Sequence, residues 1–182
     1  MQRSESRIQG VLVVTPDVFG DERGFFMETY ARTKYGALGI TEAFVQDNVS
    51  VSTQNVVRGL HGDPMMSKLV QVVRGAAFDV VVDARQGSPT FGTWEAFVLS
   101  EENHHQVNVP RGCLHGFQAL SDLVVLSYKQ SAEYDPEREL GVLWEDRALA
   151  IDWPAKAAAV VSARDRSSGA FTEILAAAPT PR

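Results

Sequence analysis

The sequence contains a single cysteine, Cys113, among its 182 residues. One cysteine cannot form an internal disulfide, and a chain without disulfides is typical of the reducing cytoplasm. We therefore predict a cytoplasmic protein. Cys113 itself is expected to behave as a small, buried or half-buried hydrophobic residue.

Long hydrophobic runs are also missing. The stretch around Phe78 to Val82 is interrupted by Arg74, Asp79 and Asp83, well short of the roughly 20 apolar residues that a membrane helix needs. Residues 1–5 lack the apolar run of a signal peptide. We therefore predict no membrane partner.

An excess of positive charge is absent as well. The 17 Lys and Arg residues stand against 23 Asp and Glu residues, which gives a net charge of -6 at pH 7. Such a chain has no general attraction to phosphate backbones, so we predict no nucleic-acid partner. With 45% hydrophobic and 22% charged residues, residues 1–182 are expected to form a single globular domain.

Motifs for metals and cofactors are the last absence. The four histidines, His61, His104, His105 and His115, include no HxH or HxxxH pair. Adjacent His104 and His105 are expected on opposite faces of a strand, exposed to solvent, where they cannot bind one ion. A glycine-rich phosphate loop, a serine nucleophile elbow and a CxxC pair are missing too. We predict no metal and no organic cofactor, which excludes dehydrogenase, P-loop and zinc-hydrolase chemistry.

Short runs rich in valine, phenylalanine and leucine are present throughout, separated by turn-forming residues, and they predict strands. The eight predicted strands are Ile8–Val14, Ala43–Ser52, Lys68–Arg74, Ala76–Asp83, Thr93–Leu99, His105–Val109, His115–Ala119 and Leu123–Gln130. Their regular spacing favours an all-β, closed or double-sheet antiparallel architecture. Only Gly75 separates two of these strands, which predicts a tight hairpin between them.

Helices are expected to be short and peripheral. Residues Thr29–Leu38 are predicted to form one of them. The alanine-rich segments Ala155–Ala159 and Glu173–Ala178 lie beside proline and glycine, so we predict helical caps or arms. They belong to a C-terminal tail, residues 155–182, that is expected to pack on or beside the domain, with residues 176–182 frayed.

Polar residues occupy strand-like segments that a core would otherwise fill with apolar ones. The densest group comprises Gln46, Asn48, Arg58, His61 and Lys68. With a loop of about six residues between them, His61 and Lys68 can point into one cavity, and Arg58 can reach the same mouth. A base with two cations suits an anionic substrate that carries a carbonyl group. The alternative is that His61 is a hydrogen-bonded core histidine.

A second polar group surrounds His115, thirteen residues before Tyr128. That spacing allows a strand, a turn at residues 121–122 and a return strand, which would place His115 and Tyr128 near one end of a hairpin. The phenol of Tyr128 would then be available as an acid. The alternative is that Tyr128 lies at the edge of the core with a satisfied hydroxyl group.

Eight segments, taken in order, resemble a known family. They are Asp21–Glu28, Gln46–Ser50, Arg58–His61, Lys68–Val70, Asp79–Arg85, Ser88–Gly92, Pro110–Phe117 and Trp144–Pro154. Together, from about Ile8 to Asp165, they resemble the dTDP-4-dehydrorhamnose 3,5-epimerase family. The resemblance implies a cupin double-stranded β-helix (jelly roll) with short peripheral helices, a homodimer, and catalysis without a metal or cofactor.

The resemblance also implies a reaction, the inversion of carbons 3 and 5 of a nucleotide-linked 4-keto-6-deoxyhexose in deoxysugar biosynthesis. The ketone at carbon 4 acidifies the neighbouring hydrogens, so a base, a group that stabilises the enolate and an acid suffice. By resemblance, His61 is the base, Lys68 stabilises the oxyanion and Tyr128 is the acid. Asp165, at the end of the segment Ser162–Asp165, orients the base.

The remaining family positions imply contacts with a nucleoside diphosphate sugar. Arg23 and Arg58 fall where the family binds the diphosphate. The other implied substrate contacts are Phe19, Phe26, Glu28, Gln46, Asn48, His115 and Tyr134, of which Tyr134 is also the alternative acid. An ion pair with Glu22 or Glu28 is the alternative role for Arg23.

The loop after His61 departs from the family's pattern. Gly62 and Asp63 stand where the family has an aromatic residue and glutamine, and the loop to Lys68 is shorter. This departure leaves open inversion at carbon 3 only and action on another nucleotide sugar. Two further alternatives that share the jelly roll are a 3,4-ketoisomerase and a non-catalytic sugar-nucleotide-binding cupin. A metal-dependent cupin oxygenase does not fit, because the HxH ligand pair is absent.

Overall fold

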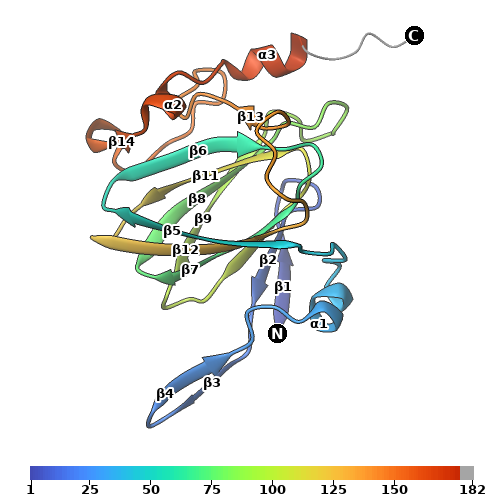
Figure 1. The fold of residues 1–182 in the computed structure, drawn as a ribbon, viewed down its shortest axis with the longest axis vertical. Coiled ribbons are helices and arrows are strands. Elements are labelled where there is room, and N and C mark those ends of the chain that lie inside the picture. Colours follow the sequence, from blue (N-terminus) through green and yellow to red (C-terminus); the bar gives the residue numbers. More distant parts are fainter. Residues whose placement is uncertain (177–182) are drawn as a thin grey trace.

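Two mainly antiparallel sheets face each other in the computed structural model, which describes residues 1–176 (Figure 1). The first sheet has the strand order β1 (Gln2–Glu5), β2 (Leu12–Thr15), β10 (Gln106–Val109), β7 (Lys68–Arg74), β12 (Leu123–Gln130), β5 (Gln46–Thr53). The second has the order β13 (Leu140–Gly141), β6 (Val56–Gly62), β11 (Cys113–Ala119), β8 (Ala76–Asp83), β9 (Trp94–Ser100), and β14 (Val160–Val161) pairs with β6. The predicted all-β, double-sheet jelly-roll fold is confirmed.

The predicted tight hairpin at Gly75 is wrong. Strands β7 and β8 belong to different sheets, and Gly75 is the point at which the chain crosses between them. Hairpins need a turn of at least about two residues, so a single glycine cannot reverse the chain within one sheet. Gly75 has a φ of +78°, and a Cβ there would lie 2.2 Å from the carbonyl oxygen of Leu123. Strands β11 and β12 likewise lie in opposite sheets, so His115 and Tyr128 do not share a hairpin.

The two adjacent histidines also differ from expectation. His104 and His105 precede β10 instead of lying within a strand, and both are half-buried. His104 adopts a φ of +54°, and its ring lies 4.8 Å from that of Phe25 between ring centres. The prediction of a solvent-exposed pair on two faces of a strand is therefore wrong.

Two apolar layers enclose the second sheet. Val70, Val81 and Phe117 belong to the layer between the sheets. Trp144 and Trp153 belong to a second layer, on the outer side of that sheet, where the chain after β13 covers it. The C-terminal part of the chain thus packs against β6 and brings polar residues to the end of the sandwich.

The helices are short, as expected. They are α1 (Arg32–Ala37), the 3₁₀ turn η1 (Lys156–Ala158), α2 (Ala163–Arg166) and α3 (Phe171–Ala176). Within residues 1–176, none of these helices has the length or the apolar character to cross a membrane. The fraying expected at the C-terminus concerns mainly residues 177–182, which lie outside the described residues.

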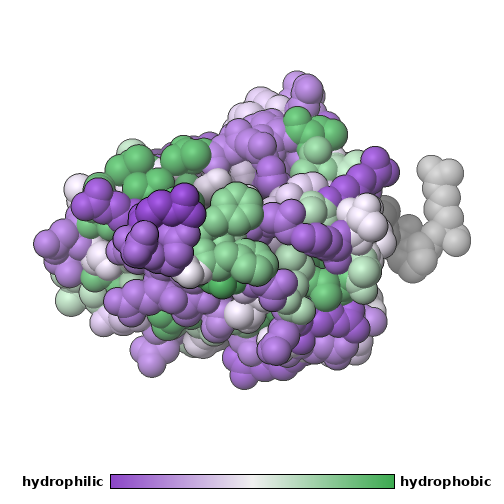
Figure 2. Space-filling model, turned by 90° about the horizontal axis from the view of Figure 1, so that it is seen from below, coloured by the Kyte–Doolittle hydropathy of each residue, from purple (hydrophilic) through white to green (hydrophobic). Residues whose placement is uncertain are grey.

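A two-stranded hairpin, β3 (Val18–Asp21) and β4 (Gly24–Met27), projects from the body of the molecule (Figure 1). Sequence patterns did not predict it, because its residues alternate neither in polarity nor with a buried face. Phe19, Phe25 and Phe26 are all exposed on it. Seen from the end where the hairpin projects, hydrophobic atoms lie at the surface among polar ones (Figure 2).

Candidate active site

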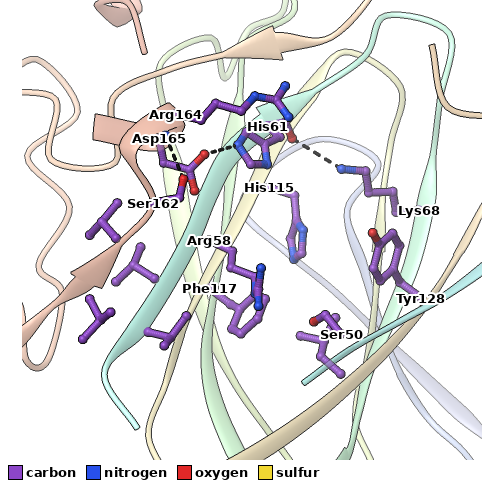
Figure 3. A pocket seen from close by; sticks show the side chains of 15 residues that line it. Ser50, Arg58, His61, Lys68, His115, Phe117, Tyr128, Ser162, Arg164 and Asp165 are labelled. Atoms are coloured by element: carbon purple, nitrogen blue, oxygen red, sulfur yellow. Dashed lines mark hydrogen bonds and ion pairs between the residues drawn. The ribbon is translucent and has the colours of Figure 1, made fainter. Parts of the chain in front are cut away.

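A cavity of about 500 Å³ opens between the two sheets, beside α2 (Figure 3). Polar side chains from both sheets reach into it. The labelled residues that line it are Ser50, Arg58, His61, Lys68, His115, Phe117, Tyr128, Ser162, Arg164 and Asp165. The cavity brings together six residues that the sequence predicted as site residues, Arg58, His61, Lys68, His115, Tyr128 and Asp165.

Strand register explains how these residues meet. His61 on β6 lies directly opposite His115 on β11, so the two imidazoles are neighbours on one wall. Tyr128 on β12 is opposite Val70 on β7, two residues from Lys68, so Lys68 and Tyr128 share the inner face of the other sheet. The predicted shared cavity for His61 and Lys68 is confirmed, although their strands belong to opposite sheets.

His61 is paired with a buried carboxylate. Its Nε2 lies 2.8 Å from Oδ1 of Asp165, and Oδ2 of Asp165 accepts from the backbone N–H of Gly59 at 3.4 Å. Ser162 caps the N-terminus of α2 by accepting from the N–H of Asp165, which fixes that residue. The carboxylate holds the proton on Nε2, so the lone pair of Nδ1 is free to accept a proton.

The charge state of His61 suits a base. Burial lowers the pKa of His61 from 6.5, the charge and hydrogen bond of Asp165 oppose this shift, and Lys68 and Arg164 add to it. The imidazole is therefore neutral at pH 7. Burial raises the pKa of Tyr128 above its ordinary value, with Arg58 opposing, so the phenol keeps its proton. The pocket thus holds a ready base and a ready acid on different sheets.

Lys68 lies close to the base. Its Nζ donates to the carbonyl oxygen of His61 at 3.5 Å (Figure 3). Burial lowers the pKa of Lys68 to about 8, while the charges of Asp79 and Asp63 oppose the shift. A lysine in this place can neutralise an oxyanion that develops beside His61.

His115 forms a second histidine–carboxylate pair. Its Nε2 lies 2.7 Å from Oδ2 of Asp79, and both side chains are buried. Oδ1 of Asp79 is buried without a hydrogen-bond partner in the described structure. Arg58 is held by Ser52 Oγ at 3.0 Å and the carbonyl oxygen of Val51 at 3.2 Å, which fixes a guanidinium group at the wall. The site is therefore cationic on two sides, as an anionic substrate requires.

Comparison with known proteins identifies the chain. The family model for dTDP-4-dehydrorhamnose 3,5-epimerase matches residues 5–173. A relative of that name from Escherichia coli is 41% identical over 174 residues, with 93% of this chain and 94% of the relative covered. The chain belongs to the dTDP-4-dehydrorhamnose 3,5-epimerase family. Family membership makes it an isomerase and confirms the resemblance described above.

Solved structures of this family agree in fold. A dTDP-4-dehydrorhamnose 3,5-epimerase from Bacillus anthracis with TDP and PPi bound is 41% identical, with a TM-score of 0.90, over 93% of this chain and 98% of that one. A dTDP-6-deoxy-D-glucose-3,5-epimerase from Legionella pneumophila in complex with dTDP-4-keto-L-rhamnose is 41% identical, with a TM-score of 0.91, over 94% and 93%. These relatives favour neither a ketoisomerase nor a non-catalytic binding protein.

Several predicted substrate contacts of this family member lie outside the cavity. Phe19, Arg23 and Phe26 belong to the projecting hairpin, where the Arg23 side chain is 84% exposed and paired with Asp21 rather than with Glu22 or Glu28. Glu28 follows the hairpin and pairs with Lys34. The structure of one chain therefore does not bring these residues to His61.

Three more predicted contacts lie near the cavity but do not line it. Gln46 and Asn48 continue the row of Ser50 along β5, joined by a hydrogen bond of 2.9 Å from Gln46 Nε2 to Asn48 Oδ1. Tyr134 lies in the segment after β12, where its backbone N–H donates to Gln46 Oε1 at 2.9 Å and its hydroxyl donates to Glu139 at 3.1 Å.

Sequence reasoning missed four polar groups of the site. Ser50, Ser162 and Arg164 line the cavity, and Asp79 supports His115. Asp79 did carry a signal, a charged residue within the apolar run of β8. Ser50 carried one as well, because its alternation with Gln46 and Asn48 places all three on one face of a strand. Within residues 1–176, no group of three or more His, Cys, Asp or Glu side chains is arranged to hold a metal ion.

Proposed function

We propose that this protein inverts carbon 3 and carbon 5 of a dTDP-linked 4-keto-6-deoxyhexose, of the dTDP-4-dehydro-6-deoxyglucose type, through an enolate. The observation that carries the proposal is the pairing of a neutral histidine with a protonated tyrosine across one cavity, on walls formed by opposite sheets. A base and an acid on opposite walls can act on opposite faces of a sugar ring, which is what inversion needs.

The roles follow from the contacts. Nδ1 of His61 removes the proton next to the ketone, and Asp165 stabilises the imidazolium that forms. Lys68 neutralises the enolate oxygen, with His115 beside it. Tyr128 donates its proton on the other face, and proton exchange with water then returns His61 to the neutral form and Tyr128 to the protonated form. The electron pair of the broken C–H bond passes to the carbonyl oxygen and back, so the step needs no redox partner.

The substrate class is supported by charge and by the relatives. Arg58, whose guanidinium lines the cavity, suits a diphosphate. The relatives from B. anthracis and L. pneumophila bind TDP with PPi and dTDP-4-keto-L-rhamnose, respectively. A dTDP-linked keto sugar is the substrate that fits both observations.

A homodimer completes the proposed site. An isolated two-stranded hairpin with exposed phenylalanines is marginally stable in water and needs a covering surface. A second copy of the chain supplies that surface if the hairpin lies against its neighbour. Arg23, Phe19, Phe26 and Glu28 then contact the substrate in the partner's cavity instead of their own.

The direct test offers the protein dTDP-4-dehydro-6-deoxyglucose in deuterated water and locates the incorporated deuterium by NMR. We expect deuterium at carbons 3 and 5 with inverted configuration. In His61→Asn the rates of deuterium incorporation and of inversion should both fall by several orders of magnitude. Label at carbon 3 alone would restrict the reaction to one centre. A moved carbonyl would identify a ketoisomerase, and binding without label would contradict catalysis.

Tyr128→Phe separates the two proton transfers. Without the phenol, His61 still forms the enolate, which then recovers a proton from the face it left. We expect deuterium with retained configuration, while inversion falls steeply. A packing role for Tyr128 instead predicts that exchange and inversion fall by the same factor, in which case Tyr134 becomes the candidate acid.

A further inference from the structure

The loop of residues 62–67 joins the two groups that would carry the chemistry, His61 at the end of β6 and Lys68 at the start of β7. Since β6 and β7 belong to opposite sheets, this loop sets the distance between the base and the lysine across the cavity. It is also the segment in which the sequence departs from the family's pattern. What fixes the loop therefore bears directly on the reaction.

Asp63 anchors the first half of this loop. It is buried, with 4% of its surface exposed. Its Oδ1 accepts from the N–H of Met65 at 2.7 Å, and its Oδ2 accepts from Nε of Arg138 at 3.3 Å. A buried carboxylate is costly unless it is paired in this way, so Asp63 depends on Arg138.

Arg138 ties the loop to the segment between β12 and β13. Besides Asp63, its guanidinium donates to Asp135 Oδ2 at 2.7 Å and to the carbonyl oxygen of Glu133 at 3.2 Å. The second half of the loop is fastened to the same segment, because the N–H of Ser67 donates to Ser131 Oγ at 2.8 Å. Both ends of the loop therefore rest on residues 131–138.

The charge of Asp63 also acts on Lys68. The charged or titratable groups that line the cavity with Lys68 are Arg58 and His61 from β6, His115 from β11, Tyr128 from β12, and Arg164 and Asp165 from α2. Asp79 from β8 and Asp63 from the loop are the carboxylates whose charge favours the protonated lysine. Asp79 is already committed to His115, whereas Asp63 is shared with Arg138.

We propose that Asp63 and Arg138 are positioning residues for Lys68: the buried pair fixes the loop between the base and the lysine and holds a carboxylate in that loop. The proposal rests on the role of Lys68 in the proposed function.

The test is an NMR titration of the lysines. The chain has four, Lys34, Lys68, Lys129 and Lys156, so ¹³C-lysine labelling gives few signals, and Lys68→Met identifies the signal of Lys68. We expect Asp63→Asn to lower the titration midpoint of Lys68 by about half to one pH unit, the size of one partly neutralised charge. Arg138→Met, which leaves the carboxylate in place and removes its partner, should not lower the midpoint.

Asp135→Asn is the matched control, since it removes a carboxylate that contacts Arg138 but does not face Lys68. It should leave the midpoint unchanged. A purely structural role predicts that Asp63→Asn and Arg138→Met shift the midpoint in the same direction, toward the ordinary value, as the loosened loop admits water. Shifts of the same sign, or no shift in either variant, would overturn the proposal.

The titration does not depend on turnover. Failure of the wild-type protein to exchange substrate hydrogens would refute the proposed function, while a lower midpoint in Asp63→Asn but not in Arg138→Met would still establish the effect of Asp63 on Lys68. Asp63→Glu, which keeps the charge, should restore a midpoint close to that of the wild type. If Asp63→Asn does not fold, the double variant Asp63→Asn/Arg138→Met, which leaves neither charge of the pair unpaired, carries the comparison. It should lower the midpoint, whereas a purely structural role predicts that the midpoint rises.

Discussion

Burial has opposite chemical consequences for His61 and Tyr128, the two residues that the proposed function assigns to proton transfer. It lowers the pKa of His61 and so favours the neutral base, and it raises the pKa of Tyr128 and so favours the protonated acid. One environment thus prepares both groups for neutral pH. Asp165 limits the decrease in the pKa of His61, because its negative charge raises the pKa that burial lowers.

The pH dependence of isotope exchange follows from these directions. In the proposed mechanism His61 must be neutral, so kcat/KM should fall on the acid side, at a pH below 6.5. Lys68 must be charged, so kcat/KM should also fall on the basic side, near pH 8. In Asp165→Asn the pKa of His61 loses the charge that raises it. We expect the acid limb to move to lower pH while turnover drops by about two to four orders of magnitude. A lower rate with an unmoved limb would assign Asp165 a structural role only.

Residue types predicted the centre of the site but not its surroundings. His61, Lys68 and Tyr128 were identified both from polar residues in strand-like segments and from the motifs of the resembling family, and Asp165 from those motifs alone. Arg164 and Asp63 were not, since their contacts depend on where the segments after β12 and β13 return. Such contacts between distant segments leave no local pattern in a sequence.

Among the secondary-structure elements, the prediction was most accurate for buried strands. The bounds of β7, β8 and β12 match the predicted ones, because apolar β-branched residues run through each strand. The pairing of these strands was not predictable from the same pattern, as Gly75 shows. β1, β3 and β4 were missed, since their residues are exposed and carry no alternation. β6, β13 and β14 were not among the eight predicted strands either.

The contact between β6 and β11 supports both histidines, and Gly59 makes it possible. Its φ is +125°, and a Cβ there would lie 2.6 Å from Cα of Gly116 and 2.9 Å from the carbonyl oxygen of His115. We expect Gly59→Ala to lower the free energy of unfolding by about 2 to 5 kcal/mol, because strain and overpacking add. Denaturant unfolding measures this change.

Gly36→Ala is the control for that substitution. Gly36 lies in α1, and a Cβ there meets nothing within 4 Å. Because alanine has a higher helix propensity than glycine, we expect the free energy of unfolding to rise by about 0.5 to 1 kcal/mol. If Gly59→Ala and Gly36→Ala change the free energy of unfolding equally, β6 and β11 can move apart to accept the added Cβ without loss of stability.

At the scale of the whole molecule, the hairpin and the cavity are the two parts that one chain does not unite. The hairpin projects away from the sandwich, and its Arg23 is exposed (Figure 1). The edge strand β5 also leaves Val45, Val49 and Val51 exposed around its outer face. Both features favour association, because exposed apolar surface and open strand edges are usually covered.

The proposed sharing of each site between two chains makes a prediction that no monomer can satisfy. Light scattering should give twice the 19.9 kDa of one chain.

Arg23→Ala and His61→Asn should each be weakly active or inactive at substrate concentrations well below KM. When the two variants are co-expressed, half of the dimers combine them, and each of these has one intact site. We therefore expect about a quarter of the wild-type activity, from the statistics of a twofold dimer. Co-expression of His61→Asn with Asp165→Asn should restore nothing, because both residues lie in one cavity. Equal recovery in both mixtures, or a molecule at the mass of one chain, would place Arg23 outside the site.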